Sequence, residues 1–465
     1  MRTKSFFLIL SFYFILTTIQ AQSVDDAFKQ AKKENKIVMM FVESPDCPQC
    51  NDVADKGISG DAVKQLIKDS CVFIKTKSKD FDQLVSPSLF VISKTFFGIA
   101  YFDADRNILY IAPNSTSLSY TYLQNINLAL KEKRETENNY AALKKNYYNR
   151  LNDSQSIRKL IEKILSMKAE PKQSLIDELT MKASEDSLNA VSFVQFIMRT
   201  APLINSTALL NIGKNKDNYN VAWYGMSLQE RKTINARLTN KSLVKAVSDK
   251  DMSYAFTVAN YVQQTYTTNY EEGQKANQSI ILQYYKMIKD TTNYLRNVSQ
   301  FYERYYMNIS ADKAKADDSI ALKKMVKNTI NDSTKRKADS LRFVELGVKP
   351  PTGGTLNRVM VSYSPQRQIY AGALNEGAWT VYTYTKDVNY INKALTWARH
   401  GIEIYESPEI IDTYARLLYR TNNKEEAISW EQKAVDKRKE MKMPASEFEK
   451  VLNLMKSGAV KIDEY

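Results

Sequence analysis

Apolar and polar residues follow two different periods in the first part of the chain. Residues 23–36 place apolar side chains three and four positions apart, which predicts an amphipathic helix, and Ser23 with Asp26 suits its N-terminal cap. The uninterrupted apolar run IVMMFV (37–42) has the length of a buried strand. The alternation continues as a helix at 60–70, a strand at 71–77, a hairpin at 100–112 and a helix at 118–134. The pattern predicts a small α/β domain over residues 22–134.

The pattern changes after residue 134. Helical spacing with many tyrosines predicts a helical region over 135–345, without a convincing strand and with degenerate repeats as one interpretation. Within it, residues 311–342 are rich in charge and poor in aromatic residues, which predicts an exposed helix or a mobile arm. The segment GVKPPTGGT (347–355) is the clearest break in the chain.

The C-terminal part, residues 346–465, contains an internal repeat. The sequence ALTW at 394–397 recurs as AISW at 427–430, and a helix-like segment precedes each copy. A period near 34 residues, with small residues at helix crossings, resembles tetratricopeptide repeats. We therefore expect an all-α, tetratricopeptide-like region that makes protein–protein contacts.

Residues 1–21 have the pattern of a cleavable signal peptide. Arg2 and Lys4 precede an apolar run at 6–19, and Ala21 marks a cleavage point. No cysteine follows that run, so no lipid anchor is expected, and no later window is apolar enough to span a membrane. We expect a periplasmic or secreted protein that does not span the membrane after signal cleavage. In such compartments a cysteine pair can rest as a disulfide.

Composition and charge exclude several classes of function. The single histidine, His400, rules out His-rich zinc sites, and it lies in an ordinary helical pattern rather than a catalytic one. The net charge of +14 raises the question of an anionic partner. However, Lys and Arg are interspersed with Asp and Glu along helical stretches, as on solvated helix faces, and no nucleic-acid-binding motif is present. We expect no metal, no cofactor and no nucleic-acid partner.

The most chemically specific motif is CPQC, which follows directly after the predicted buried strand. The strand delivers Cys47 to the sheet edge, where the next helix begins and its unpaired amide groups favour thiolate over thiol. Pro48 suits the first helical position, and Gln49 completes a spacing that lets Cys50 reach Cys47. In this interpretation Cys47 is the attacking nucleophile and Cys50 the resolving thiol.

The segments KIVMMFVESPDCPQC and FDADRNILY resemble the thioredoxin-like superfamily, over roughly residues 23–134. The resemblance implies a central sheet flanked by helices, and thiol–disulfide exchange with protein partners through mixed disulfides, without a cofactor. The inner Pro-Gln is similar to the Cys-Pro-x-Cys of glutaredoxins and periplasmic disulfide oxidoreductases. With its helical, repeat-bearing tail, the chain resembles envelope thioredoxin-family proteins of Gram-negative bacteria. We therefore expect an exported thiol–disulfide oxidoreductase with a part in cell redox homeostasis.

The chain also departs from that family. Asp46 stands where thioredoxins usually have Trp, and with Glu43 nearby it should raise the pKa of Cys47. The family's cis-proline would fall near Phe97, where this chain has no proline. Placing it at Pro87 instead would make residues 88–92 a strand, but Ser86-Pro87 also suits the start of a helix, and we favour the version without the proline. The alternative is a non-catalytic thioredoxin-fold and helical-repeat scaffold in the envelope, with CPQC as a stabilising disulfide.

The third cysteine, Cys71, opens a predicted strand and is interpreted as a buried apolar residue. A third redox cysteine is the sharper alternative. Zinc binding by Cys71 and the CPQC pair lacks further ligands. Neither the direction of exchange nor the substrate follows from the sequence.

Overall fold

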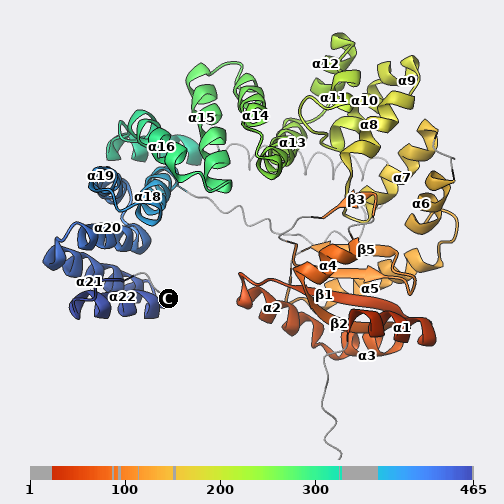
Figure 1. Ribbon diagram of the computed structural model, residues 1–465, viewed down its shortest axis with the longest axis horizontal. Coiled ribbons are helices and arrows are strands. Elements are labelled where there is room, and N and C mark those ends of the chain that lie inside the picture. The colour runs from red at the N-terminus through yellow and green to blue at the C-terminus, as the bar shows by residue number, and fades with distance from the viewer. Residues whose placement is uncertain are drawn as a thin grey trace, which may run out of the picture. The chain divides into compact units, whose positions relative to one another are not determined.

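The computed structural model describes residues 23–85, 88–92, 96–113, 115–149, 153–323, 325–326 and 365–462. A small N-terminal α/β region with a four-stranded mixed sheet is followed by a long, predominantly helical region (Figure 1), as expected. The chain divides into two compact units between Lys241 and Ser242, within helix α13 (Leu228–Asp249). The expected signal peptide, residues 1–21, lies outside the described part.

The sheet has the strand order β2-β1-β4-β5. Strand β1 (Ile37–Glu43) pairs in parallel with β2 (Cys71–Lys77) and antiparallel with β4 (Gly98–Phe102), which turns into β5 (Ile108–Pro113). Residues 37–42 are all fully buried, because β1 has a strand on each side and helices on each face. The strands expected at 37–42 and 71–77 and the hairpin at 100–112 are confirmed.

Three helices cover one face of the sheet: α2 (Pro48–Ile58), α3 (Asp61–Ser70) and α5 (Ser119–Arg134). Helices α2 and α5 approach closely at Gly57, where an added Cβ would lie 2.3 Å from the ring of Tyr122. The Ser119 hydroxyl donates a hydrogen bond to the Gly57 carbonyl at 2.8 Å. Because only glycine fits there, α2 is pressed against α5 and its start is held at the end of β1.

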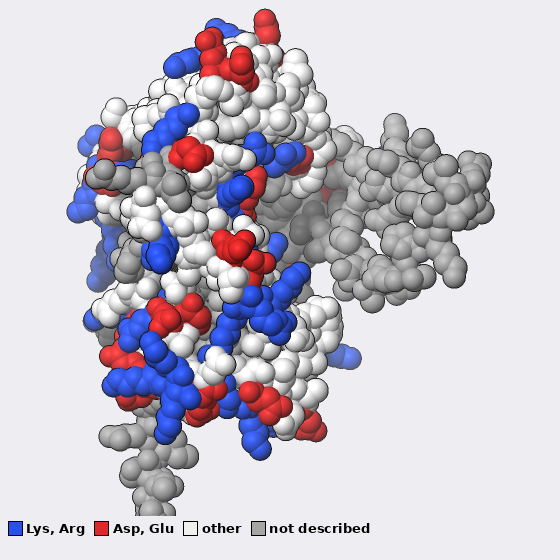
Figure 2. Space-filling model, turned by 90° about the vertical axis from the view of Figure 1, so that its right-hand side faces the viewer, with Lys and Arg blue, Asp and Glu red and all other residues white. Residues whose placement is uncertain are grey.

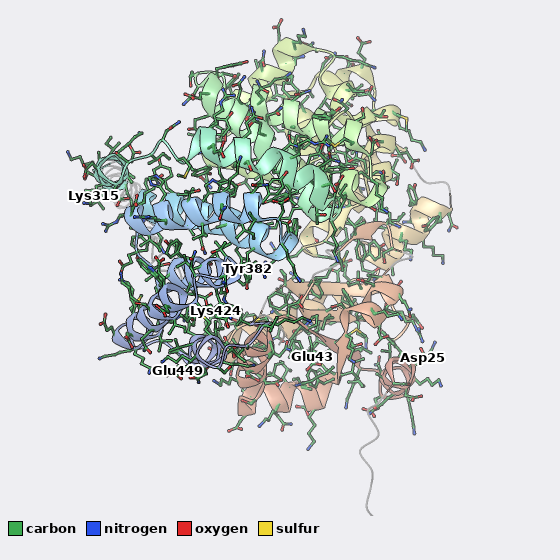
Figure 3. The ribbon with its side chains drawn as sticks, turned by 60° about the vertical axis from the view of Figure 1, so that its left-hand side comes forward. Asp25, Glu43, Lys315, Tyr382, Lys424 and Glu449 are labelled. Atoms are coloured by element: carbon green, nitrogen blue, oxygen red, sulfur yellow. A yellow bond between two sulfur atoms is a disulfide. The ribbon has the colours of Figure 1, made fainter. Side chains whose placement is uncertain are left out.

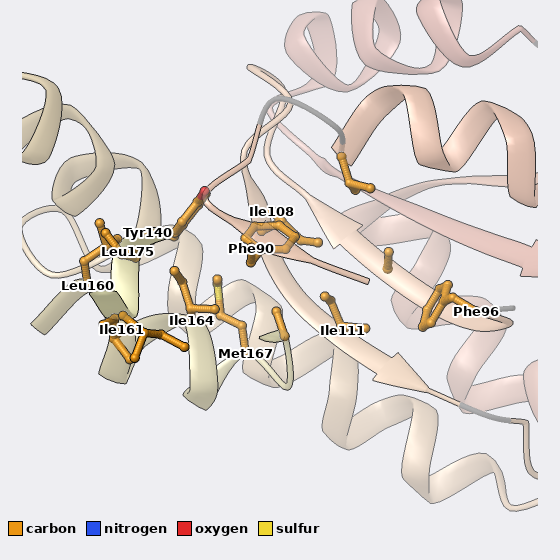
Figure 4. Packing of buried hydrophobic residues seen from close by; sticks show 14 of the residues in the cluster. Phe90, Phe96, Ile108, Ile111, Tyr140, Leu160, Ile161, Ile164, Met167 and Leu175 are labelled. Atoms are coloured by element: carbon orange, nitrogen blue, oxygen red, sulfur yellow. The ribbon is translucent and has the colours of Figure 1, made fainter. Parts of the chain in front are cut away.

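The other face of the sheet is covered by α1 (Val24–Glu34), α4 (Ser78–Val85) and α7 (Ser154–Ser166), with α6 (Tyr140–Tyr148) packed on α7. In α1 the expected cap is present, since the Ser23 hydroxyl accepts a hydrogen bond from the Asp26 amide at 3.1 Å. Figure 4 shows Ile164 and Met167 packed toward Ile108 and Ile111 of β5. The sheet and the helices that follow it therefore share one hydrophobic core.

The helical region contains one short strand, so the expectation of no strand in 135–345 was wrong at this point. Strand β6 (Glu170–Pro171) pairs antiparallel with β3 (Phe90–Val91), and the Lys172 amide donates to the Leu89 carbonyl at 3.0 Å. Residues 88–92 are also not part of the helix expected to begin at Ser86-Pro87. Those two residues lie outside the described part, and 88–92 contains β3 instead, because partners distant in sequence satisfy its backbone.

The rest of the first unit is helical, and its helices continue the shared core. They are α8 (Gln173–Lys182), α9 (Glu185–Asn189), α10 (Val191–Arg199), α11 (Thr207–Ile212), α12 (Lys216–Tyr224) and the first part of α13. The second unit contains α14 (Met252–Gln264), α15 (Tyr270–Met287), α16 (Thr291–Tyr305), α18 (Gln366–Tyr384), α19 (Val388–Ile404), α20 (Pro408–Arg420), α21 (Lys424–Glu440) and α22 (Ser446–Lys456). Residues 311–323 are helical and mostly exposed; the remainder of the expected arm beyond 326 lies outside the described residues.

Helix α16 packs onto the helices that follow it through a close contact at Gly377. A Cβ at Gly377 of α18 would lie 2.3 Å from the ring of Tyr302 in α16. The same ring lies 5.1 Å from that of Trp397 in α19, which is buried. The repeated sequences fall in two successive helix pairs, α18–α19 and α20–α21, each pair packed along its length.

The charged residues are mixed over the surface. Figure 2 shows Lys and Arg side chains beside Asp and Glu side chains over the face that it draws. Many of them form ion pairs, such as Arg106 with Asp25 at 2.6 Å and Lys32 with Asp105 at 3.0 Å. Over the described ranges, no helix has both the length and the apolar character that a membrane crossing requires.

Candidate functional site

The CPQC motif lies at the start of helix α2, directly after the short loop that follows strand β1. Cys47 is the N-terminal cap of α2 and Pro48 its first residue, as the sequence predicts. The sulfurs of Cys47 and Cys50 form a disulfide, with 2.00 Å between the two sulfurs and 5.3 Å between the Cα atoms. The structure thus brings the two cysteines together, whereas their roles as nucleophile and resolving thiol stay predictions.

The disulfide lies in a partly exposed turn and is next to the polar start of a helix. Both cysteines are half-buried, while Pro48 and Gln49 are exposed on the outside of the turn. The sulfur of Cys47 accepts a hydrogen bond from the Cys50 amide at 3.2 Å. This amide belongs to the first turn of α2, whose N–H groups carry partial positive charge, so it would stabilise a thiolate at Cys47 after reduction.

A side chain that the sequence analysis did not single out holds the loop before Cys47. Asn51, on the first turn of α2, accepts a hydrogen bond from the Ser44 amide at 2.9 Å and donates one to the Ser44 carbonyl at 3.0 Å. The two bonds close the loop from the end of β1 to α2 and fix where Cys47 sits. Nothing in the sequence distinguishes this asparagine from the many others, because its partner is a backbone group.

The two carboxylates expected to act on Cys47 are placed differently from each other. Figure 3 labels Glu43, the last residue of β1, whose carboxylate lies 3.9 Å from the ammonium of Lys75 on β2. Lys75 also pairs with Asp55 of α2 at 2.8 Å and lies 5.6 Å from the centre of the Phe41 ring. Asp46 is exposed. One of the two negative charges therefore has a cationic neighbour that the sequence analysis missed.

Cys71 is buried and remote from the Cys47–Cys50 pair, which agrees with its interpretation as a buried apolar residue. It is a free cysteine, 5% exposed, and it pairs with Ile37 at the opposite end of β1 from the CPQC loop. The two ends of β1 are six residue steps apart, or about 20 Å at 3.3 Å per residue. Burial raises the pKa of the Cys71 thiol to about 12, although the charge of Lys36 opposes the shift. Such a thiol is unreactive at neutral pH.

The contacts of His400 join structural elements. The two ring nitrogens of His400 lie 2.9 Å from the carbonyl oxygen of Ile309 and 3.2 Å from the carboxylate of Glu403, which ties α19 to the chain after α16. Within the described ranges, no three His, Cys, Asp or Glu side chains come together as metal ligands would.

No family model, no curated protein and no solved structure matches this chain. Its function is therefore inferred from the geometry around Cys47 and Cys50.

Proposed function

We propose that the protein is an exported thiol–disulfide oxidoreductase of the thioredoxin-like superfamily. One observation carries the proposal: a half-exposed disulfide caps the N-terminus of α2, with the sulfur of Cys47 accepting a hydrogen bond from the Cys50 amide. The fold supports it, because strands β1 and β2 are parallel and the CxxC follows β1 in a βαβ arrangement. A sheet flanked by helices is what the family resemblance implies.

The exchange proceeds by two displacements at sulfur. A substrate thiolate attacks the sulfur of Cys47, the Cys47–Cys50 bond breaks, and Cys50 leaves as thiolate, giving a mixed disulfide. The second thiolate of the same substrate then attacks the substrate sulfur that is bonded to Cys47. The substrate disulfide forms, and Cys47 leaves as a thiolate. The substrate dithiol loses two electrons and two protons, and the cysteine pair takes them up. The reverse sequence reduces a substrate disulfide, with the thiolate of Cys47 attacking first.

In this proposal the residues around the disulfide have separate tasks. The Cys50 amide stabilises negative charge on Cys47, whether it is attacking or leaving. Asn51 holds the loop so that Cys47 stays at the cap position. Lys75 offsets the charges of Glu43 and Asp55, which would otherwise oppose a thiolate nearby.

In this proposal the helices of the second unit are tetratricopeptide-like repeats that dock protein partners. The pairs α18–α19 and α20–α21, with Trp397 and Trp430 at matching positions, support it. The protein works in the periplasm or outside the cell after removal of residues 1–21. Export is tested by N-terminal sequencing of secreted protein: we expect a mature chain that begins at Gln22, and an intact Met1 would contradict export by cleavage.

The activity is tested with purified mature protein. We expect it to accelerate insulin reduction by dithiothreitol or the refolding of scrambled ribonuclease, and Cys47→Ser to abolish the acceleration. Cys50→Ser should accumulate mixed disulfides with envelope proteins, because the resolving thiol is gone. Cys71→Ala is the matched control, since it removes a thiol but leaves the pair, and it should retain activity.

The competing proposal is a scaffold in which CPQC only staples the loop. It is favoured by the exposed carboxylate of Asp46 beside Cys47, which opposes a thiolate. Activity no higher than that of Cys47→Ser, together with no trapped species in Cys50→Ser, would decide for the scaffold.

A further inference from the structure

A pocket in the second unit has a composition that suits a negatively charged ligand. Its volume is about 530 Å³, and it opens between the end of α18, α20 and α22. The wall combines aromatic, basic and aliphatic side chains within a single compact unit. It is lined by Trp379, Tyr382, Thr383, Tyr384, Thr385, Lys386, Arg416, Arg420, Glu447, Lys450, Val451 and Ile462.

One wall of the pocket is an aromatic platform. The rings of Trp379 and Tyr382 on α18 are stacked, with their centres 5.3 Å apart and their planes 25° from parallel. Figure 3 labels Tyr382 near the end of α18. Tyr382 is buried, but Trp379 is 38% exposed, which is unusual for a side chain whose burial is so favourable. An exposed indole at the wall of a pocket offers a flat apolar surface to a ligand.

Two arginines are held in place against this platform. The guanidinium of Arg416 lies 5.5 Å from the centre of the Trp379 ring and pairs with Asp412 at 2.8 Å. Arg420 lies over the Tyr382 ring and donates hydrogen bonds to the carbonyls of Tyr382 and Thr385. Stacking and hydrogen bonds already order these guanidinium groups. The two arginine side chains therefore lose little conformational entropy when an anion binds to them.

The charge of the lining is predominantly positive. Lys386, from the loop after α18, and Lys450, from α22, are exposed and add to the two arginines, whereas Glu447 is the single acidic residue in the lining. Because Arg416 is already paired with Asp412, the excess positive charge comes from Lys386, Arg420 and Lys450 against Glu447, and it attracts an anion and disfavours a cation. The lysines come from different elements, so one extended ligand can meet both.

We propose that this pocket binds an acidic peptide segment of a partner protein. Carboxylates of the segment meet Lys386 and Lys450, while an aromatic or aliphatic side chain lies on the indole of Trp379. An open pocket with aromatic, aliphatic and basic walls matches a peptide with alternating acidic and apolar side chains. It matches an inorganic anion less well, because such an anion has no apolar surface to place on the aromatic rings. This inference is independent of the redox site.

The test uses the full mature chain and a fluorescein-labelled peptide, Gly-Glu-Asp-Tyr-Glu-Glu, in an anisotropy titration. We expect saturable binding that weakens as salt rises, and that weakens at least tenfold in the double variant Lys386→Glu/Lys450→Glu. Lys442→Glu is the matched control: it reverses the charge of an exposed lysine outside the pocket lining and should change the affinity less than twofold. Trp379→Ala should weaken binding without altering the dependence on salt.

Four results would overturn the proposal. The first is equal binding of a peptide with Gln and Asn in place of Glu and Asp, and the second is an unchanged affinity in the double variant. The third is tighter competition by a mononucleotide than by the unlabelled peptide, which would assign the pocket to a small anion. The fourth is binding that appears only when residues 463–465, Asp-Glu-Tyr, are deleted, which would make the chain itself the occupant.

Discussion

Asn51 and Ser44 are joined by two hydrogen bonds, one in each direction, between the asparagine side chain and the serine backbone. The pair spans the loop that carries Cys47, so the position of the disulfide depends on an amide side chain that has no part in the exchange itself. The strand end and the helix start are thereby joined as one rigid corner.

Replacing Asn51 with Ala should loosen that corner. Two hydrogen bonds at about 1 kcal/mol each are lost, so the free energy of unfolding should fall by about 2 kcal/mol in the oxidised protein. Urea denaturation followed by circular dichroism measures this change. Asp52→Ala, at the next and exposed position, is the control and should change stability by less than about 0.5 kcal/mol. Equal effects of the two substitutions would contradict a role for the Asn51–Ser44 pair.

The three cysteines should differ sharply in reactivity. After reduction with dithiothreitol, N-ethylmaleimide at pH 7 should modify Cys47 and Cys50 in the folded protein, because both are half-buried at the surface of the turn. Cys71 should react only in denaturant, since burial raises its pKa to about 12 and closes access to it. Mass spectrometry should find two adducts in the native state and three in guanidinium chloride. Native modification of Cys71 would place it in a reactive environment after all.

Glu431 on α21 makes stability depend on pH. Burial, and then the neighbouring charge of Asp412, raise the pKa of this fully buried carboxyl from 4.5 to about 9, with Arg416 opposing the shift. Between those values the folded chain holds a proton that the unfolded chain has released, so the free energy of unfolding falls as pH rises. The expected slope is on the order of 1.4 kcal/mol per pH unit within that window.

Glu431→Gln, which copies the protonated carboxyl, should remove most of that slope and raise the melting temperature of the second unit at pH 8. Glu425→Gln, at an exposed position of the same helix, is the control and should leave the slope in place. Calorimetry at pH 5, 6.5 and 8 distinguishes the two. A parallel decline in wild type and Glu431→Gln would show that another group carries the pH dependence.

The core shared by the sheet and the later helices predicts coupling between them. Ile164 of α7 is fully buried beside the sheet, so Ile164→Ala should destabilise the first unit by about 2–5 kcal/mol. Hydrogen exchange in β4 and β5 should accelerate as well, although the substitution lies outside the α/β region. Lys159→Ala, on the exposed side of α7, should leave that exchange unchanged. Acceleration confined to α7 would mean that the sheet is stable without it.

Local signals in the sequence were sufficient for the elements around the site. The cap of α1 depends on Ser23 and Asp26, three residues apart, and β1 on six consecutive apolar residues, so both were predictable from short windows. The pairing of the two cysteines was predictable for the same reason, because they lie three residues apart, about one turn of helix.

What could not be predicted depends on partners far apart in the sequence. The Ile111 amide at the sheet edge donates to the Met167 carbonyl at 3.3 Å, and the Leu89 amide donates to the hydroxyl of Tyr140 at 2.9 Å. Nothing near Leu89 in the sequence announces such a bond, and so residues 88–92 were expected to continue a helix. Lys75 was likewise invisible as a neighbour of Glu43, because parallel pairing across β1 and β2 brings them together.

The contact between Tyr302 and Gly377 has a consequence for the covalent continuity of the second unit. Because α16 is locked onto α18 and α19 through side chains, the peptide bonds between residues 327 and 364 are not what holds these helices together. A protease that cuts within that stretch should yield two pieces that still travel as one particle.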